Sequence, residues 1–142
     1  MPHVILFVDD EPDVLAILHR SFAADEDYEV LTAPSGALAL ETLRSRRVDL
    51  LVSDQRMPEM SGVELVEAAH RIDPELCAIL LTAYTDPKDI VDAINRGQVW
   101  RYLVKPWERA DLRATVRTAL AQVDLRRGRA RLYAEAERRP EG

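Results

Sequence analysis

The sequence has little of what disulfide-bonded, membrane-spanning or secreted proteins need. Cys77 is the one cysteine among 142 residues, which excludes an internal disulfide or a cysteine metal site and favours a reducing compartment. The longest apolar runs have five or six residues, whereas about 20 are needed to cross a bilayer. The early run Val4–Val8 is followed at once by aspartates and lacks the small-residue cleavage site of a secretory signal. We therefore expect a cytoplasmic protein with no membrane association.

Basic residues are scarce over most of the chain. Residues 1–108 carry 10 Lys+Arg against 20 Asp+Glu, a net charge of −10, while residues 109–142 carry 9 against 5, a net charge of +4, which gives −6 for the whole chain. Phosphate contacts require clustered Lys and Arg, so we expect no direct nucleic-acid binding by this segment. Only Lys88 and Lys105 are lysines, and an isolated lysine among arginines is a hint of a position that needs a compact ammonium.

Short apolar runs alternate with amphipathic stretches five times along the chain. The predicted strands are residues 4–8, 28–33, 48–53, 76–82 and 99–104. Helical periodicity follows each of them, starting at Pro12, Ser35, Ser61, Asp86 and about Glu108. This alternation predicts an α/β fold with a parallel sheet covered on both faces. Five units are too few for an eight-stranded barrel, so we expect an open, doubly wound sheet with five helices, the last one extended.

Polar side chains follow four of the five predicted strands. Asp9-Asp10-Glu11 follows the first strand, Asp54 the third, Thr82 ends the fourth and Lys105 follows the fifth, whereas the second ends in Ala33-Pro34. In open α/β sheets, ligands bind beyond the carboxyl ends of the strands. Clustered carboxylates repel unless a hard cation such as Mg²⁺ joins them, and one of them can then attack a phosphoryl group. An ammonium and a hydroxyl would share the charge on the phosphoryl oxygens.

Each of these residues also has an ordinary structural explanation. An aspartate after a strand often caps the next helix, Thr82 is a common type of strand-end residue, and Lys105 could be a solvated lysine. Four strand ends carry matched chemistry, and only the end of the second strand carries none. This joint pattern favours the functional interpretation. The pattern therefore predicts phosphoryl capture on Asp54.

Four segments in this order resemble the receiver domain of two-component response regulators, over about residues 4–123. They are V-I-L-F-V-D-D-E at 4–11, S-D-Q-R-M-P at 53–58 with Gly62, L-T-A at 81–83, and Y-L-V-K-P at 102–106. The resemblance implies a flavodoxin-like sheet with strand order 2-1-3-4-5. It also implies that Asp54 accepts a phosphoryl group from a sensor histidine kinase or a phosphotransfer protein.

The resemblance implies further roles for residues around Asp54. Mg²⁺, or Mn²⁺ in its place, would be held by Asp9, Asp10, Asp54 and the backbone carbonyl of Arg56. Thr82 and Lys105 would bind the phosphoryl oxygens, and the Lys105–Pro106 peptide would be cis.

A switch is implied as well. Thr82 would move toward the phosphoryl group and Tyr102 would turn inward, with the small Ala83 leaving room, so that the surface of helix 4, strand 5 and helix 5 changes shape. That surface would contact a downstream effector domain or protein, or a second copy of the chain. Arg56 and Tyr84 occupy positions that in this family influence the phosphoryl lifetime.

The segments D-Q-R-M-P at 54–58, G-Q-V-W-R-Y at 97–102 and K-P-W at 105–107 resemble a receiver subgroup often fused to cyclic-di-nucleotide phosphodiesterase or transcription-activating domains. Trp100 and Trp107 could serve partner contact or core packing. Residues 1–123 are expected to form the receiver and residues 124–142 an extended C-terminal helix or linker. That helix would span about 45 Å at 1.5 Å per residue, as a linker, a coiled-coil dimerisation arm or a frayed tail. A stand-alone regulator and a fragment of a longer protein both remain open.

Three other functions fit the pattern less well. A Mg²⁺-dependent phosphatase of the haloacid-dehalogenase type needs two aspartates separated by one residue after the first strand, whereas residues 9–11 read Asp-Asp-Glu, and it needs a cap domain. A flavodoxin-like cofactor binder needs a Gly- or Ser/Thr-rich phosphate loop there. A degenerate receiver that signals unphosphorylated stays an alternative and ranks low, because every key residue is present. We expect a signalling module, not an enzyme, which catalyses only its own phosphorylation and dephosphorylation.

Overall fold

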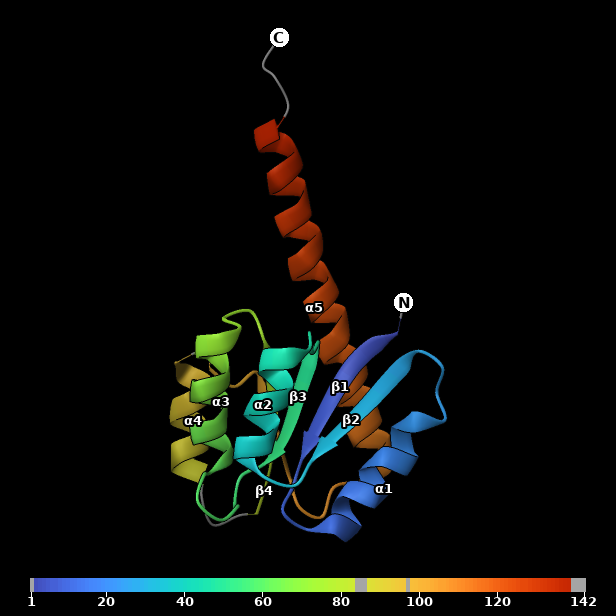
Figure 1. The fold of residues 1–142 in the computed structure, drawn as a ribbon, viewed down its shortest axis with the longest axis vertical. Helices are drawn as coiled ribbons and strands as arrows, with labels where there is room; N and C mark the ends of the chain where they lie inside the picture. The colour runs from blue at the N-terminus through green and yellow to red at the C-terminus, as the bar shows by residue number, and fades with distance from the viewer. Residues whose placement is uncertain (1, 84–86, 97, 139–142) are drawn as a thin grey trace.

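Five parallel strands form one sheet in the order β2-β1-β3-β4-β5 in the computed structural model, which describes residues 2–83, 87–96 and 98–138 (Figure 1). The strands are β1 (His3–Val8), β2 (Tyr28–Ala33), β3 (Leu50–Asp54), β4 (Cys77–Thr82) and β5 (Arg101–Val104). All four neighbouring pairs are parallel. The predicted doubly wound sheet and its strand order are confirmed.

Helices cover both faces of this sheet. They are α1 (Pro12–Ala23), α2 (Gly36–Ser45), α3 (Gly62–Ile72), α4 (Pro87–Asn95) and α5 (Arg109–Arg138). The apolar faces of α1 and α5 pack on one side of the sheet, and those of α2, α3 and α4 pack on the other (Figure 1). The molecule therefore has three layers, and β1, β3 and β4 lie between two cores.

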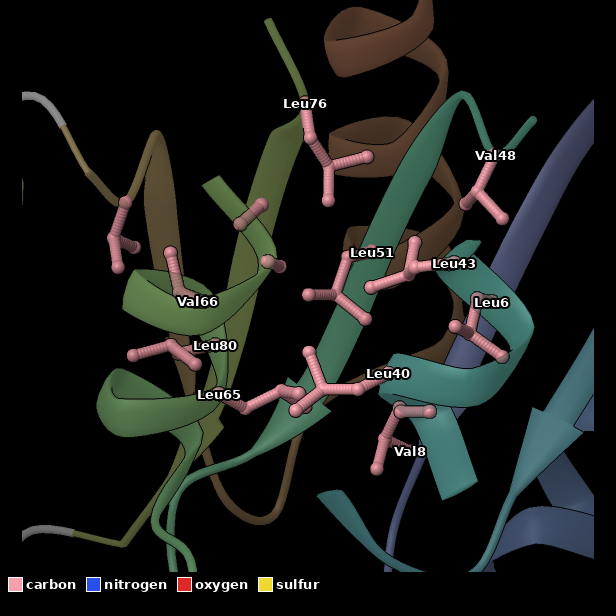
Figure 2. Close-up of a cluster of buried hydrophobic side chains, with 14 of the residues drawn as sticks. Leu6, Val8, Leu40, Leu43, Val48, Leu51, Leu65, Val66, Leu76 and Leu80 are labelled. Atoms are coloured by element: carbon pink, nitrogen blue, oxygen red, sulfur yellow. The ribbon is translucent and has the colours of Figure 1, made fainter. Parts of the chain in front are cut away.

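The two cores explain why the central strands are continuous apolar runs. In β1, Ile5 and Phe7 face the α1–α5 core, whereas Leu6 and Val8 face the α2–α3–α4 core. Figure 2 shows Leu6 and Val8 beside leucines of α2, α3 and the central strands. Removing one such side chain from water contributes about 1.5–3 kcal/mol, so both faces of a central strand must be apolar.

Serine caps begin two of the helices as predicted. The Ser35 side chain accepts a hydrogen bond from the Leu38 amide, and Ser61 forms a capping box with Glu64. Helix α1 begins differently, with Pro12 in its first turn and no side-chain cap at Glu11. Proline suits that position because the first helical amides have no partner within the helix.

Two strands begin later than the sequence pattern predicts. Strand β3 begins at Leu50 and not at residue 48, and β5 begins at Arg101 and not at residue 99. Asp49, just before β3, still contacts β1: its amide donates to the Val4 carbonyl at 2.9 Å, and its side-chain Oδ2 accepts the Val4 amide at 2.6 Å. The apolar character of Val48 and Val99 reflects their burial in the α2–α3–α4 core.

Helix α5 extends beyond the layer that it covers. Residues Leu112, Val116, Leu120 and Val123 pack on the sheet, while Leu125 is 56% exposed. The helix then continues away from the body, past the end of the sheet opposite the carboxyl ends of the strands (Figure 1). Within the described part of the chain, none of the helices is both long enough and apolar enough to span a membrane.

Candidate functional site

Three carboxylates meet at the carboxyl ends of β1 and β3. Asp9 directly follows β1, Asp54 is the last residue of β3, and Asp10 lies beside Asp9. One carboxylate oxygen from each lies within 4.8 Å of the others. Asp9 and Asp54 are buried, at 1% and 5% exposure, while Asp10 is exposed. The structure thus brings together the aspartates that the strand-end pattern singled out.

The Asp9 carboxylate is buried beside two other carboxylates, where a negative charge is unfavourable. Its Oδ1 accepts the Glu11 amide at 2.9 Å, but its buried Oδ2 has no hydrogen-bond partner among the described residues. The pKa of Asp9 is raised to about 6: burial raises it most, the Glu11 amide lowers it, and the neighbouring Asp54 carboxylate raises it. Hard cations prefer such oxygen ligands, so an unpartnered carboxylate oxygen in an acidic cluster fits Mg²⁺ or Mn²⁺.

Lys105 supplies the positive charge of the site. It follows β5, and its Nζ lies 2.6 Å from Asp54 Oδ1 and 3.9 Å from Asp9 Oδ2. The Lys105 amide donates to the Thr82 carbonyl at 2.7 Å, and the Lys105–Pro106 peptide is cis, as the resemblance implied. The other lysine, Lys88, is exposed on α4. The hint of an ammonium with a special position therefore applies to Lys105.

The other predicted site residues differ in how near they come to the carboxylates. Thr82 ends β4 and is buried, but its hydroxyl donates to the Ala83 carbonyl at 2.9 Å. Tyr102 on β5 is 36% exposed, so its ring faces outward in this conformation. Ala83 is exposed as well. Tyr84 lies outside the described residues, as do Asp86 and Gly97, where a helix start and a motif were expected.

Gln55, in the loop after Asp54, has a structural role that its place in the D-Q-R-M-P segment did not predict. Gln55 is 6% exposed, and its side-chain Oε1 accepts the Val63 amide at 2.9 Å. Arg56, next along the loop, is exposed. A single sequence carries no clear signal for this arrangement, because a glutamine in a polar loop normally faces water.

Glycine at position 62 is required by a close approach in this loop. A Cβ at Gly62 would lie 2.5 Å from the Asp54 carbonyl oxygen and 2.8 Å from Leu80 Cδ2. The Asp54 carbonyl belongs to a paired central strand, and the Leu80 side chain is fully buried. The start of α3 therefore packs directly on the backbone of Asp54.

Trp100 and Trp107 are half-buried. Both pack against the core under α1 and α5, and the Arg101 guanidinium lies 4.2 Å from the centre of the Trp100 ring. The structure therefore supports core packing as the role of both tryptophans.

Comparison with known proteins decides the family. The family model described as the response regulator receiver domain matches residues 5–117. The chain belongs to this family. The transcriptional regulatory protein GlrR of Escherichia coli K12 is 38% identical over 121 residues, which are 85% of this chain and 27% of that protein. The chain spans about a quarter of the length of the first curated relatives that it matches.

Solved receiver structures have the same fold. The signal receiver domain of an HD domain-containing protein from Pseudomonas fluorescens Pf-5 is 35% identical, with a TM-score of 0.81 over 87% of this chain and 98% of that one. The response regulator TrrA from Thermotoga maritima, in complex with Mg²⁺ and BeF, is 30% identical, with a TM-score of 0.72 over 82% of this chain and 98% of that one. The receiver domain is thus a phospho-aspartate signalling module, and the haloacid-dehalogenase alternative finds no support.

Proposed function

We propose that Asp54 is the phosphoacceptor, and that its donor is a phosphohistidine of a sensor kinase or phosphotransfer protein. The observation that carries this proposal is the convergence, from three strands, of Asp54, two further carboxylates and the Lys105 ammonium. Asp54 is the member of this cluster that ends the central strand β3 and contacts Lys105 at 2.6 Å. In the reaction, an Asp54 oxygen attacks phosphorus, the P–N bond breaks, and its electron pair leaves with the imidazole.

The acidic residues would hold the cation. Asp9, Asp10, Asp54 and the backbone carbonyl of Arg56 are the proposed ligands, supported by the unpartnered Asp9 Oδ2. A bound Mg²⁺ would supply positive charge to the oxygens of the transferring phosphoryl group. The same residues suit Mn²⁺, which shares the preference for oxygen ligands.

Lys105 and Thr82 would bind the phosphoryl oxygens once Asp54 is modified. Phosphorylation attaches a larger, more negative group to an Asp54 oxygen. The flexible stem of Lys105, whose Nζ now contacts Asp54 Oδ1, can follow the new oxygens. Thr82 would exchange its hydrogen bond to the Ala83 carbonyl for one to the phosphoryl group. Hydrolysis by water would return the carboxylate and inorganic phosphate, at a rate influenced by Arg56 and Tyr84.

The proposed output surface consists of α4, β5 and α5. Tyr102 is 36% exposed there, and inward rotation of its ring behind Thr82, with the small Ala83 leaving room, would change this surface. A downstream effector domain or protein, or a second copy of the chain, would bind it. Residues 1–123 would be the receiver, and the helix beyond would serve as a linker or dimerisation arm, in keeping with relatives of which this chain matches about a quarter of the length. The module would act in the cytoplasm, without direct nucleic-acid contact by this segment.

Intact mass tests the phosphoacceptor directly. The wild type is incubated with Mg²⁺ and acetyl phosphate, beside Asp54→Asn as the matched variant that keeps the shape and loses the nucleophile. We expect one phosphoryl addition in the wild type and none in Asp54→Asn, and chelation of Mg²⁺ should abolish the addition.

An addition that persists in Asp54→Asn would contradict the assignment. Very fast hydrolysis would hide the addition in the wild type, so beryllofluoride, which mimics the bound phosphoryl group, provides a second measurement. A folded wild type that binds Mg²⁺ but neither acetyl phosphate nor beryllofluoride would favour a degenerate receiver.

A further inference from the structure

The first amides of α3 are all paired, and one residue outside the helix pairs two of them. The opening amides of a helix have no acceptor within it. Gly62 donates to the Gln55 carbonyl at 2.9 Å, Val63 donates to the Gln55 side-chain Oε1 at 2.9 Å, and Glu64 donates to Ser61 Oγ at 3.1 Å. Ser61 is the usual kind of cap, whereas Gln55 reaches the helix from the far end of a loop.

Gln55 is also tied to the sheet. Its amide donates to the Leu81 carbonyl of β4 at 3.0 Å, and its side chain is buried. Backbone and side chain together therefore join the residue after Asp54 to both β4 and α3. The loop of residues 55–62 is closed at its base by the two bonds that Gln55 accepts.

The space around this closure is small. A Cβ at Gly62 would lie 3.0 Å from Gln55 Oε1 and 2.5 Å from the Asp54 carbonyl oxygen. Helix α3, Gln55 and the backbone of Asp54 thus form one tightly packed unit. Arg56 follows Gln55 directly, so the orientation of the Gln55 residue sets where the next peptide group begins.

We propose that Gln55 is a positioning residue for the cation site. Its side-chain amide holds the base of the loop against α3 and thereby holds the backbone carbonyl of Arg56 at the acidic cluster. The inference rests on the proposed Mg²⁺ site. Mg²⁺ demands near-ideal octahedral geometry, so a ligand carbonyl on a loosened loop binds it less well. An apolar side chain at position 55 would leave the Val63 amide without its acceptor and would release one of the two closures.

Mg²⁺ titration by calorimetry tests this inference, with Gln55→Met compared against Ser61→Ala. Methionine keeps the length of the side chain and removes the acceptor. Ser61→Ala removes the other side-chain cap of the same helix end and leaves Gln55 in place. We expect Gln55→Met to weaken Mg²⁺ binding about tenfold, the lower end of the loss seen when residues that orient metal ligands are replaced, and Ser61→Ala to change it less than about twofold. Denaturant unfolding without metal should show a loss of stability in both variants.

Hydrogen exchange supplies a second measurement that needs no metal. The Val63 amide should exchange faster in Gln55→Met than in the wild type, and the Glu64 amide should do so in Ser61→Ala. Equal Mg²⁺ affinity in Gln55→Met and wild type, with Val63 exposed to exchange, would reduce Gln55 to a helix cap and overturn the proposal. If Gln55→Met does not fold, Gln55→Asn withdraws the acceptor by one methylene and carries the same expectation. A folded wild type that takes up no Mg²⁺ would overturn the proposed cation site as well.

Discussion

At the scale of single residues, Asp9 shows a conflict between stability and function. The carboxylate is 1% exposed, lies beside Asp10 and Asp54, and leaves one oxygen without a hydrogen bond among the described residues. Its pKa is raised from 3.8 to about 6, chiefly because burial disfavours the charged form. The folded protein therefore holds a proton on Asp9 at pH values where the unfolded chain has lost it. The stabilisation linked to that proton is complete below about pH 4 and disappears as the pH rises through about 6.

We accordingly expect Asp9→Asn to stabilise the metal-free protein at pH 7.5 by about 1–3 kcal/mol, because the amide needs no charge desolvated. The gain should shrink toward pH 4.5. Urea unfolding at the two pH values measures it, with Asp13→Asn, an exposed aspartate in the first turn of α1, as the control. Equal stability of Asp9→Asn and wild type at pH 7.5 would show that burying the charged Asp9 carboxylate costs the fold no stability.

At the scale of elements, α5 is attached to the body by polar contacts as well as by its apolar face. Near its start, the Arg113 guanidinium donates to the Ser21 carbonyl at 2.5 Å, which places a cation at the C-terminal end of α1. Beyond the apolar face, Arg127 lies 2.5 Å from the Asp49 carboxylate. Asp49 is 8% exposed and also accepts the Val4 amide. The emerging helix therefore keeps a defined direction for at least one turn after Val123.

Arg127→Ala should cost about 1–2 kcal/mol of unfolding free energy, because it leaves the buried Asp49 without its cation. The expected loss is smaller than for a fully buried ion pair, since the Arg127 side chain is one-third exposed. Arg126→Ala, an exposed neighbour, should cost less than about 0.5 kcal/mol. Denaturant unfolding gives both values, and amide exchange over residues 124–128 should accelerate only in Arg127→Ala. Matching losses in the two variants would argue against a specific role for the Asp49 pair.

At the scale of the whole molecule, the proposed cation site would make the stability of the fold depend on the cation. The carboxylates are held together by strands β1 and β3, and the unfolded chain has no such cluster. A ligand that binds only the folded state stabilises it by mass action, by about 2.7 kcal/mol at 100 times its dissociation constant. Charge is also divided unevenly along the chain, with a net −10 on residues 1–108 and a net +4 on residues 109–142.

Mg²⁺ at saturating concentration should therefore raise the thermal midpoint by several degrees, and EDTA should reverse the rise. NaCl at the same ionic strength is the control for general screening. The double variant Asp9→Asn with Asp10→Asn should show no Mg²⁺-dependent rise. An equal rise in this variant would place the cation elsewhere on the molecule.

Much of the fold and of the site follows from local sequence pattern. Val4–Val8 and the run at 76–82 predict central strands because a strand between two layers needs apolar side chains on both faces. Asp9, Asp54, Thr82 and Lys105 could be placed at one edge because parallel strands put their carboxyl ends together. The predicted starts of β3 and β5 were wrong by two residues each, since burial alone makes Val48 and Val99 apolar.

The amino-acid sequence by itself determined the order of strands and helices, the sheet type and the identity of the residues at the strand ends, because these depend on periodicity and on neighbours in the chain. Only the tertiary structure decided that Gln55 caps α3, that Asp49 pairs with Arg127, and that Lys105 lies 2.6 Å from Asp54. Each of those contacts joins two different segments of the fold, and the partners are selected by how helices and loops pack on the sheet. Periodicity within one element contains no information about which polar atoms such packing will bring within hydrogen-bond distance.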